Sequence, residues 1–201
     1  GDAKAAIGSR PVFDLSASYG TNRVQNFGAG TVCITIPYTL QKGEAAGGLY
    51  AVYVDSNGNV SYITNSSYDA QAGLLRFATN HFSVYGIGYK APANFTDIAD
   101  HWAKTDIEFA VNRGLMNGSS NTTFSPDGSM TRGMFVTALG RLAGVNTDGY
   151  KTGRFTDVKA DAYYAPYVNW AAEKGIVSGT TTTTFAPDQA ISRQEMAVIM
   201  S

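Results

Sequence analysis

Residues 124–132 read FSPDGSMTR and residues 185–193 read FAPDQAISR, so Phe, Pro, Asp and Arg recur at the same spacing 61 residues later. Upstream of each stretch, the sequence FTDI at residues 95–98 returns as FTDV at residues 155–158. Matching motifs in the same order indicate an internal repeat rather than a coincidence of composition. The repeat therefore decides how the C-terminal half of the chain is organised.

Each copy of the repeat is predicted to form a helix, a loop and a second helix. In the first copy, a helix over residues 101–113 would end at Gly114, because glycine readily adopts the left-handed conformation that closes a helix. Thr131 and Ser192 precede the second helices, where a side-chain oxygen can cap the free backbone N–H groups. A short helical unit buries little apolar surface alone, so we expect the copies to pack on one another.

The part of the chain before residue 92 shows a different periodicity. Apolar and polar residues alternate in several short runs, which is the pattern of half-buried strands. The Asn57-Gly58 pair between two of these runs suits a tight hairpin. The alternating residues include Phe13, Leu15, Ala17, Val32, Ile34, Ile36, Tyr50, Val52, Val54, Val60 and Tyr62. We predict an antiparallel β-sandwich-like module with roughly six or seven short strands.

These two patterns predict an α+β multidomain chain. Residues 1–92 would form the antiparallel β module, and residues 93–149 would form the first helix–loop–helix repeat. Residues 150–201 would form the second repeat, which stops within its last helix. The β module is predicted to be sandwich-like, and both repeats are predicted to be all-α.

The composition excludes several classes of protein. The 201 residues carry 15 Lys and Arg against 16 Asp and Glu, so no cationic excess is available to neutralise nucleic-acid phosphates. Cys33 is the single cysteine and two histidines occur, so we expect no disulfide within the chain, no metal site and no cofactor. Cys33 lies among alternating apolar residues, which predicts a buried, inert thiol. We recognise no catalytic motif and no apolar run long enough to span a membrane, so neither an enzyme nor a membrane segment is expected.

The repeated motifs resemble the S-layer homology (SLH) domain of bacterial cell-surface proteins. The resemblance covers residues 94–201 and rests on Phe-x-Asp-Ile/Val, Phe-x-Pro-Asp and a Thr/Ser-Arg pair that opens the second helix. It implies a non-catalytic module that anchors a protein non-covalently to secondary polysaccharides linked to peptidoglycan, commonly polymers bearing ketal-linked pyruvate. It also implies an extracellular location at the bacterial cell surface, and three repeats arranged as a pseudo-trimer around a central helical bundle. One departure is Gly133-Met134, where the family usually has Ala-Glu.

Arg132 and Arg193 are the first candidates for binding such a polymer. An arginine can bond a carboxylate through two parallel hydrogen bonds. Each arginine also stands at the first turn of a predicted helix, where free N–H groups and the helix dipole favour an anion. The alternative is that the arginines pair with Asp127 and Asp188 in the preceding loops and only fix those loops.

Aromatic residues provide a second pair of candidates. Trp102 in the first copy corresponds to Tyr163 in the second copy. Aromatic faces are good platforms for the C–H groups of a sugar and supply a large contact area. The alternative is that this face of the helix packs against the neighbouring repeat.

Four loop residues complete the predicted ligand-binding set. Asp97 and Asp157 either accept hydrogen bonds from sugar hydroxyls or tie their loops to backbone N–H groups. Gly118 and Gly179 either serve turn geometry or let a ligand approach the backbone closely.

The leading functional hypothesis is attachment of a larger protein to the bacterial cell wall through a cell-wall polysaccharide. The alternative is a structural module that self-associates or makes lattice contacts, because an incomplete set of helical units leaves apolar faces that promote association. In that alternative the β module acts as a spacer or as a binding unit.

Overall fold

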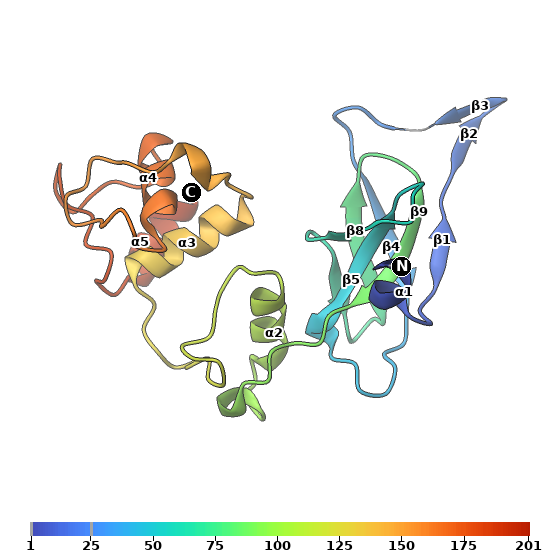
Figure 1. The fold of residues 1–201 in the computed structure, drawn as a ribbon, viewed down its shortest axis with the longest axis horizontal. Coiled ribbons are helices and arrows are strands. Elements are labelled where there is room, and N and C mark those ends of the chain that lie inside the picture. The colour runs from blue at the N-terminus through green and yellow to red at the C-terminus, as the bar shows by residue number, and fades with distance from the viewer. Residues whose placement is uncertain (1, 25) are drawn as a thin grey trace. The chain divides into compact units, whose positions relative to one another are not determined.

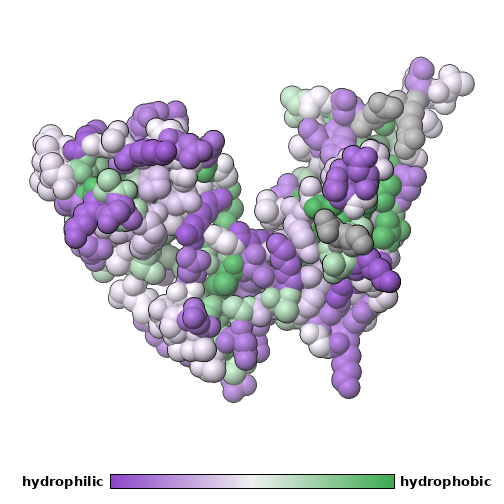
Figure 2. All heavy atoms as spheres, in the orientation of Figure 1, coloured by the Kyte–Doolittle hydropathy of each residue, from purple (hydrophilic) through white to green (hydrophobic). Residues whose placement is uncertain are grey.

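The computed structural model describes residues 2–24 and 26–201. The chain divides into two compact units, Gly1–Arg113 and Gly114–Ser201 (Figure 1). Strands dominate the first unit, whereas the second contains short helices separated by long loops. Hydrophilic residues cover much of the visible face of each unit, and apolar residues appear there in smaller patches (Figure 2).

The first unit contains two antiparallel sheets and a separate hairpin. The strands are β1 (Val12–Asp14), β2 (Ala17–Tyr19), β3 (Asn22–Val24), β4 (Val32–Pro37), β5 (Leu49–Val54), β6 (Val60–Ile63), β7 (Ser67–Asp69), β8 (Leu74–Thr79) and β9 (Val84–Tyr89). The larger sheet has the order β1-β9-β5-β6, and the second sheet has the order β4-β8-β7. Strands β2 and β3 pair with each other and project from the sheets (Figure 1).

The two sheets share one apolar core. Leu49 and Ala51 of β5 are fully buried, as is Leu75 of β8. The rings of Phe77 and Tyr85 pack within the same cluster, with their centroids 5.0 Å apart. Because successive residues of a strand point to opposite faces, the alternating sequence pattern places these side chains on the inner faces of the sheets.

The other face of β5 is covered by the short helix α1 (Asp2–Ile7). Tyr50 and Val52 of the strand form a second cluster with Ala6 and Ile7 of the helix, and all four residues are buried. Strand β5 is therefore buried on both faces, which explains its nearly continuous apolar sequence.

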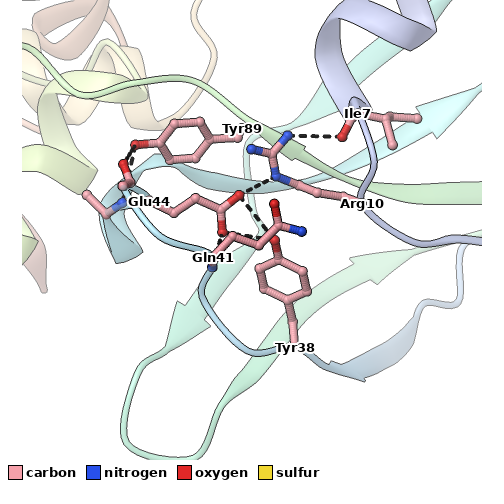
Figure 3. Close-up of polar contacts among 8 residues, drawn as sticks. Ile7, Arg10, Tyr38, Gln41, Glu44 and Tyr89 are labelled. Atoms are coloured by element: carbon pink, nitrogen blue, oxygen red, sulfur yellow. Dashed lines mark hydrogen bonds and ion pairs between the residues drawn. The ribbon is translucent and has the colours of Figure 1, made fainter.

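A buried ion pair joins the segment after α1 to the loop before β5. Arg10 Nε lies 2.6 Å from Glu44 Oε1, and the Glu44 side chain is only 4% exposed (Figure 3). Tyr38 Oη donates to Glu44 Oε2 at 2.9 Å, and the backbone N–H of Gln41 donates to the same oxygen at 2.8 Å. Burial alone would raise the pKa of Glu44, but these three hydrogen bonds hold it below its ordinary value. Burial and the Glu44 carboxylate raise the pKa of Tyr38 to about 12, so its hydroxyl remains a donor.

Replacing Glu44 by glutamine is expected to lower the melting temperature near neutral pH and to lower it much less at about pH 3. The folded-state pKa of Glu44 lies below the unfolded value of about 4.3. The ionised carboxylate therefore stabilises the fold above that pH, and the stabilisation is lost as the pH falls through the folded-state pKa. Thermal unfolding of the wild type and Glu44→Gln across this range measures the difference, with the exposed Glu173→Gln as control. A difference that does not change with pH would contradict the expectation.

Helix α2 (Lys104–Asn112) belongs to the first unit and packs against the 3-10 turn η1 (Ala46–Gly48). A Cβ atom at Gly47 would lie 2.8 Å from the backbone nitrogen of Phe109, so the close approach requires glycine. Tyr50 Oη donates to the carbonyl oxygen of Asn112 at 2.7 Å. These contacts fix the C-terminal end of the helix to the sheet.

Arg113, the residue after α2, is held tightly against the β strands. Its Nη2 atom donates to the carbonyl oxygens of Ser66 at 2.6 Å and Leu49 at 3.0 Å. The guanidinium carbon lies 3.8 Å from the ring centroid of Phe109 and 4.2 Å from that of Tyr50. Arg113 thus combines charge-assisted hydrogen bonds with two cation–π contacts.

Helices α3 (Arg132–Leu142), α4 (Ala165–Glu173) and α5 (Arg193–Met200) form the second unit, together with the 3-10 turn η3 (Thr147–Gly149). Their buried core consists of Val136, Phe155, Val168, Ala171, Val177 and Phe185. Helix α3 packs against α4 through two glycines. A Cβ atom at Gly133 would press on the Tyr164 ring, and one at Gly140 would overlap the Tyr167 ring.

The predicted fold class is wrong for the region of the repeats, because that region is not all-α. Helices cover residues 104–112, 132–142, 165–173 and 193–200, and most of the remainder is loop and turn. The described chain as a whole is β-rich, with two antiparallel sheets and few helices. Loop chemistry explains the difference: Ser120 Oγ accepts hydrogen bonds from the backbone N–H groups of Thr122 and Thr123 at 3.1 and 3.0 Å. Such side-chain bonds compete with helix formation.

The helix ends follow the sequence signals. Gly114 and Gly175 have φ angles of 68° and 71°, which is the left-handed conformation predicted for them. Thr131 caps α3, and Ser192 caps α5 in a full capping box with Glu195. The predicted domain boundaries at residues 92/93 and 149/150 stay predictions. The compact units meet at a different place, residues 113/114, so the first repeat is divided between them.

The prediction of a buried Cys33 is wrong, because its side chain is exposed. Strand β4 lies at an edge of its sheet, and Ile34 and Ile36 turn toward the core while residue 33 faces the opposite side. Among the described residues, no helix combines the length and apolar character required to cross a membrane.

Candidate functional site

A groove of about 220 Å3 lies in the second unit, at the loop that follows Gly114. One side is the loop itself, another is the exposed face of α3, and Tyr163 contributes from the segment before α4. An adjoining hollow continues along the same loop toward Phe124 and Pro126. The groove is lined by Leu115, Met116, Asn117, Gly118, Met130, Met134, Thr137, Arg141 and Tyr163.

The groove combines apolar surface with a few polar groups. Met116, Met130 and Met134 supply flexible, polarisable side chains that adapt to a partner's shape. Tyr163 is 56% exposed, so part of its ring is open to a ligand. Burial and the nearby Asp188 carboxylate raise the pKa of Tyr163, with Arg141 opposing the rise, so its hydroxyl is neutral at ordinary pH.

Arg141 supplies the guanidinium group that lines the groove. Its Nη1 atom makes a long contact of 3.5 Å with the carbonyl oxygen of Leu115. The ion pairs of the described residues do not include Arg141. The side chain can therefore offer further N–H donors to an acidic ligand.

Arg132 lies elsewhere, in the interior of the second unit. The residue is 6% exposed, and its Nε atom donates to the carbonyl oxygen of Phe185 at 3.0 Å. Nη1 lies 2.6 Å from Glu195 Oε1, and Nη2 donates to the carbonyl oxygen of Ser178 at 3.2 Å. All three guanidinium nitrogens have protein partners, although the partner carboxylate is Glu195 and not Asp127 or Asp188.

Arg193, the counterpart of Arg132 in the second copy, is exposed at the start of α5. Met134 replaces Glu195 in the first copy, so the two copies are not chemically equivalent at this point. The ligand-binding roles of both arginines stay predictions, and the geometry gives Arg132 a structural role as well.

The remaining predicted residues fall into both units. Trp102 is 88% exposed and lies in the first unit, whereas Tyr163 lines the groove of the second. Asp97 lies in the 3-10 turn η2 (Thr96–Ile98) of the first unit. The structure therefore brings Gly118 and Tyr163 together in one groove, and their ligand contacts stay predictions.

Asp157 and Gly179 have structural contacts. Asp157 accepts hydrogen bonds from the backbone N–H groups of Phe185 at 2.9 Å and Ala186 at 2.7 Å. Ala186 has a φ angle of 57°, so the carboxylate holds a turn that a non-glycine residue rarely adopts. A Cβ atom at Gly179 would overlap the carbonyl oxygens of Thr181 and Thr184.

The sequence analysis missed Arg141 and the methionines of the groove. The available signal was helical spacing, because Met134, Thr137 and Arg141 stand three and four residues apart on one face of α3. That face differs from the one that buries Val136. Among the described residues, no group of three or more His, Cys, Asp or Glu side chains is placed to hold a metal ion.

Residues 94–133 and 154–197 match the family model of the S-layer homology domain. An amylopullulanase of Thermoanaerobacterium thermosulfurigenes is 34% identical over 131 residues, which are 65% of this chain and 7% of that protein. The exoglucanase XynX of Acetivibrio thermocellus is 33% identical over 110 residues, or 55% of this chain and 10% of that protein. The surface-layer 125 kDa protein of Lysinibacillus sphaericus is 31% identical over 99 residues, or 49% of this chain and 8% of that protein.

The two matched segments belong to the S-layer homology domain family, so the resemblance inferred from the repeat motifs is confirmed. The predicted location at the bacterial cell surface is confirmed by the same matches. The chain spans only about a tenth or less of the length of these relatives. Self-association through the repeats stays a prediction.

Proposed function

We propose that the chain anchors a larger surface protein to the bacterial cell wall by binding a peptidoglycan-linked secondary polysaccharide in the groove around Gly118 and Tyr163. The family of the two repeats supports the anchoring role. The observation that carries the binding site is the open groove at the repeat loop, with an exposed aromatic ring and an arginine outside any ion pair of the described residues. The proposal assigns no catalytic role to the chain.

The groove suits one sugar unit of an acidic polymer. The Tyr163 ring and the methionine side chains would contact the C–H faces of the sugar. Gly118 lets the sugar approach the backbone closely, since it carries no side chain. Arg141 would hold the acidic substituent, which the resemblance suggests is a ketal-linked pyruvate, through charge-assisted hydrogen bonds.

The test is co-sedimentation of the chain with Gram-positive sacculi before and after chemical removal of the secondary polymer. Tyr163→Ala and Arg141→Gln are each expected to weaken binding about tenfold or more, because each removes a direct ligand contact. Lys174→Ala, an exposed change on the second repeat, is the matched control and should bind like the wild type.

Binding that survives removal of the polymer would contradict the proposed ligand. Wild-type affinity in both groove variants would contradict the proposed site, even if the chain sediments with sacculi. Melting temperatures of the variants should stay within a few degrees of the wild type, because Tyr163 and Arg141 lie outside the buried core.

A further inference from the structure

The groove of the second unit contains an Asn-Gly pair, Asn117-Gly118, and both residues line it. The sequence holds a second Asn-Gly pair, Asn57-Gly58, in the first unit. Such pairs are chemically reactive, because glycine has no side chain to keep its backbone nitrogen away from the preceding side-chain amide. The two pairs differ in their surroundings, and this difference predicts which of them reacts.

Hydrogen bonds hold the Asn57-Gly58 pair in the hairpin between β5 and β6. The backbone N–H of Gly58 donates to the carbonyl oxygen of Asp55 at 3.0 Å. The N–H groups of Asn57 and Asn59 both donate to Asp55 Oδ1 at 2.8 Å. These bonds must break before the nitrogen of Gly58 can attack the Asn57 side chain, and breaking them costs free energy.

The Asn117-Gly118 pair lacks these restraints. Both residues lie in the irregular loop after Gly114, and Asn117 is exposed. Within the part of the chain that the structure describes, no hydrogen bond holds the Gly118 N–H group or the Asn117 side chain. The nitrogen of Gly118 can therefore meet the side-chain carbonyl carbon of Asn117 without first breaking a bond.

We propose that Asn117 is a site of spontaneous deamidation, and that the product places a negative charge in the groove. The backbone nitrogen of Gly118 loses its proton and forms a bond to Asn117 Cγ. The bond from Cγ to the side-chain nitrogen breaks, and that nitrogen leaves with the proton as ammonia. Water then opens the resulting cyclic imide at either carbonyl carbon, which gives aspartate or isoaspartate at position 117. Water is the only other reactant, so the reaction needs no enzyme and no oxidant.

The new charge changes what the groove can bind. Either product carries a carboxylate, which is ionised at neutral pH because an aspartate side chain has an ordinary pKa of about 3.9. The carboxylate stands on the loop that Arg141 contacts through the carbonyl oxygen of Leu115. It competes with an acidic ligand for the Arg141 guanidinium and repels the ligand itself. This consequence rests on the proposed function, and it means that the groove loses affinity as the protein ages.

The second repeat has no equivalent reaction. Ser178 stands where the first repeat has Asn117, so Gly179 follows a residue without a side-chain amide. The chain thus supplies its own unreactive replacement, and Asn117→Ser is the matched variant.

The first measurement incubates the full chain in mildly alkaline buffer and follows both Asn-Gly pairs by tryptic peptide mapping with mass spectrometry. Asn117 is expected to deamidate at least about tenfold faster than Asn57, because the hairpin around Gly58 must open before it reacts. In denaturant the hairpin is lost, so the two rates should become similar. Equal rates in the folded chain, or faster reaction at Asn57, would overturn the proposal.

The second measurement is co-sedimentation with sacculi. Asn117→Asp, and wild-type protein after incubation, are expected to bind at least about fivefold more weakly than fresh wild-type protein. Asn57→Asp adds the same charge to the first unit and should bind like the wild type. Asn117→Ser should have the same affinity before and after incubation.

The outcomes separate this proposal from the proposed function. Unchanged affinity of Asn117→Asp and of the deamidated protein would overturn the effect on the groove. Absence of binding by fresh wild-type protein would instead overturn the proposed function. The rates at Asn117 and Asn57 would then still decide whether Asn117 is a deamidation site.

Discussion

Replacing Arg132 by alanine is expected to lower the free energy of unfolding of the second unit by about 3 kcal/mol. The change removes two charge-assisted hydrogen bonds and leaves the carbonyl oxygens of Phe185 and Ser178 without their donor. It also removes the guanidinium that lies 4.7 Å from the centroid of the Phe185 ring. The ion pair with Glu195 adds little, because that carboxylate is one-third exposed and screened by water.

Calorimetry of the full chain measures the effect as a fall in melting temperature of about 12 °C or more. Arg193→Ala is the matched control, because it removes the equivalent residue of the other copy from an exposed position. The control is expected to change stability by less than about 0.5 kcal/mol. Equal melting temperatures for the two variants, with wall binding lost only in Arg132→Ala, would instead make Arg132 a ligand-binding residue.

Replacing Arg113 by alanine is expected to destabilise the first unit by about 3 kcal/mol. The carbonyl oxygens of Ser66 and Leu49 would lose the Arg113 donor, and the rings of Phe109 and Tyr50 would lose their contact with its guanidinium. Helix α2 would then be held against the sheet mainly by the contact at η1 and by the hydrogen bond from Tyr50 to Asn112. We expect faster hydrogen exchange of the α2 amides as well as a lower melting temperature.

Lys174→Ala provides the comparison for Arg113. Lys174 follows the equivalent helix of the second repeat, but it is exposed, and its Nζ atom lies 3.2 Å from the exposed Glu173 carboxylate. This change should leave both stability and exchange of α4 unaltered. A stable Arg113→Ala variant with unchanged exchange in α2 would show that the buried guanidinium does not fix the helix to the β strands.

The parts of the fold that could be predicted depend on short-range chemistry. Alternating residues indicate the strands, and the left-handed glycines Gly114 and Gly175 mark the helix ends. The caps at Thr131 and Ser192 follow from the same local rules. These features depend on residues only a few positions apart, so a single sequence is enough to predict them.

The features that could not be predicted depend on contacts between distant segments. Arg132 finds its acceptors 46 to 63 residues away, and no local pattern distinguishes it from the exposed Arg193. Arg113 likewise reaches Ser66 and Leu49 in the β strands, although the periodicity assigns it to the repeat. Motif positions gave Gly118 and Tyr163, which line the groove, whereas Arg141 required knowledge of which face of α3 is open. Ligand binding by Gly118 and Tyr163 stays a prediction.

Cys33 is the one cysteine in the sequence, and its exposed position on edge strand β4 makes it a natural attachment point for a fluorescent dye. A maleimide reagent would place a single reporter on each molecule, within the first unit and without an engineered residue. Because the thiol faces away from Ile34 and Ile36, the dye should not disturb the packing of the sheets. Labelled protein could then be imaged directly on intact bacteria.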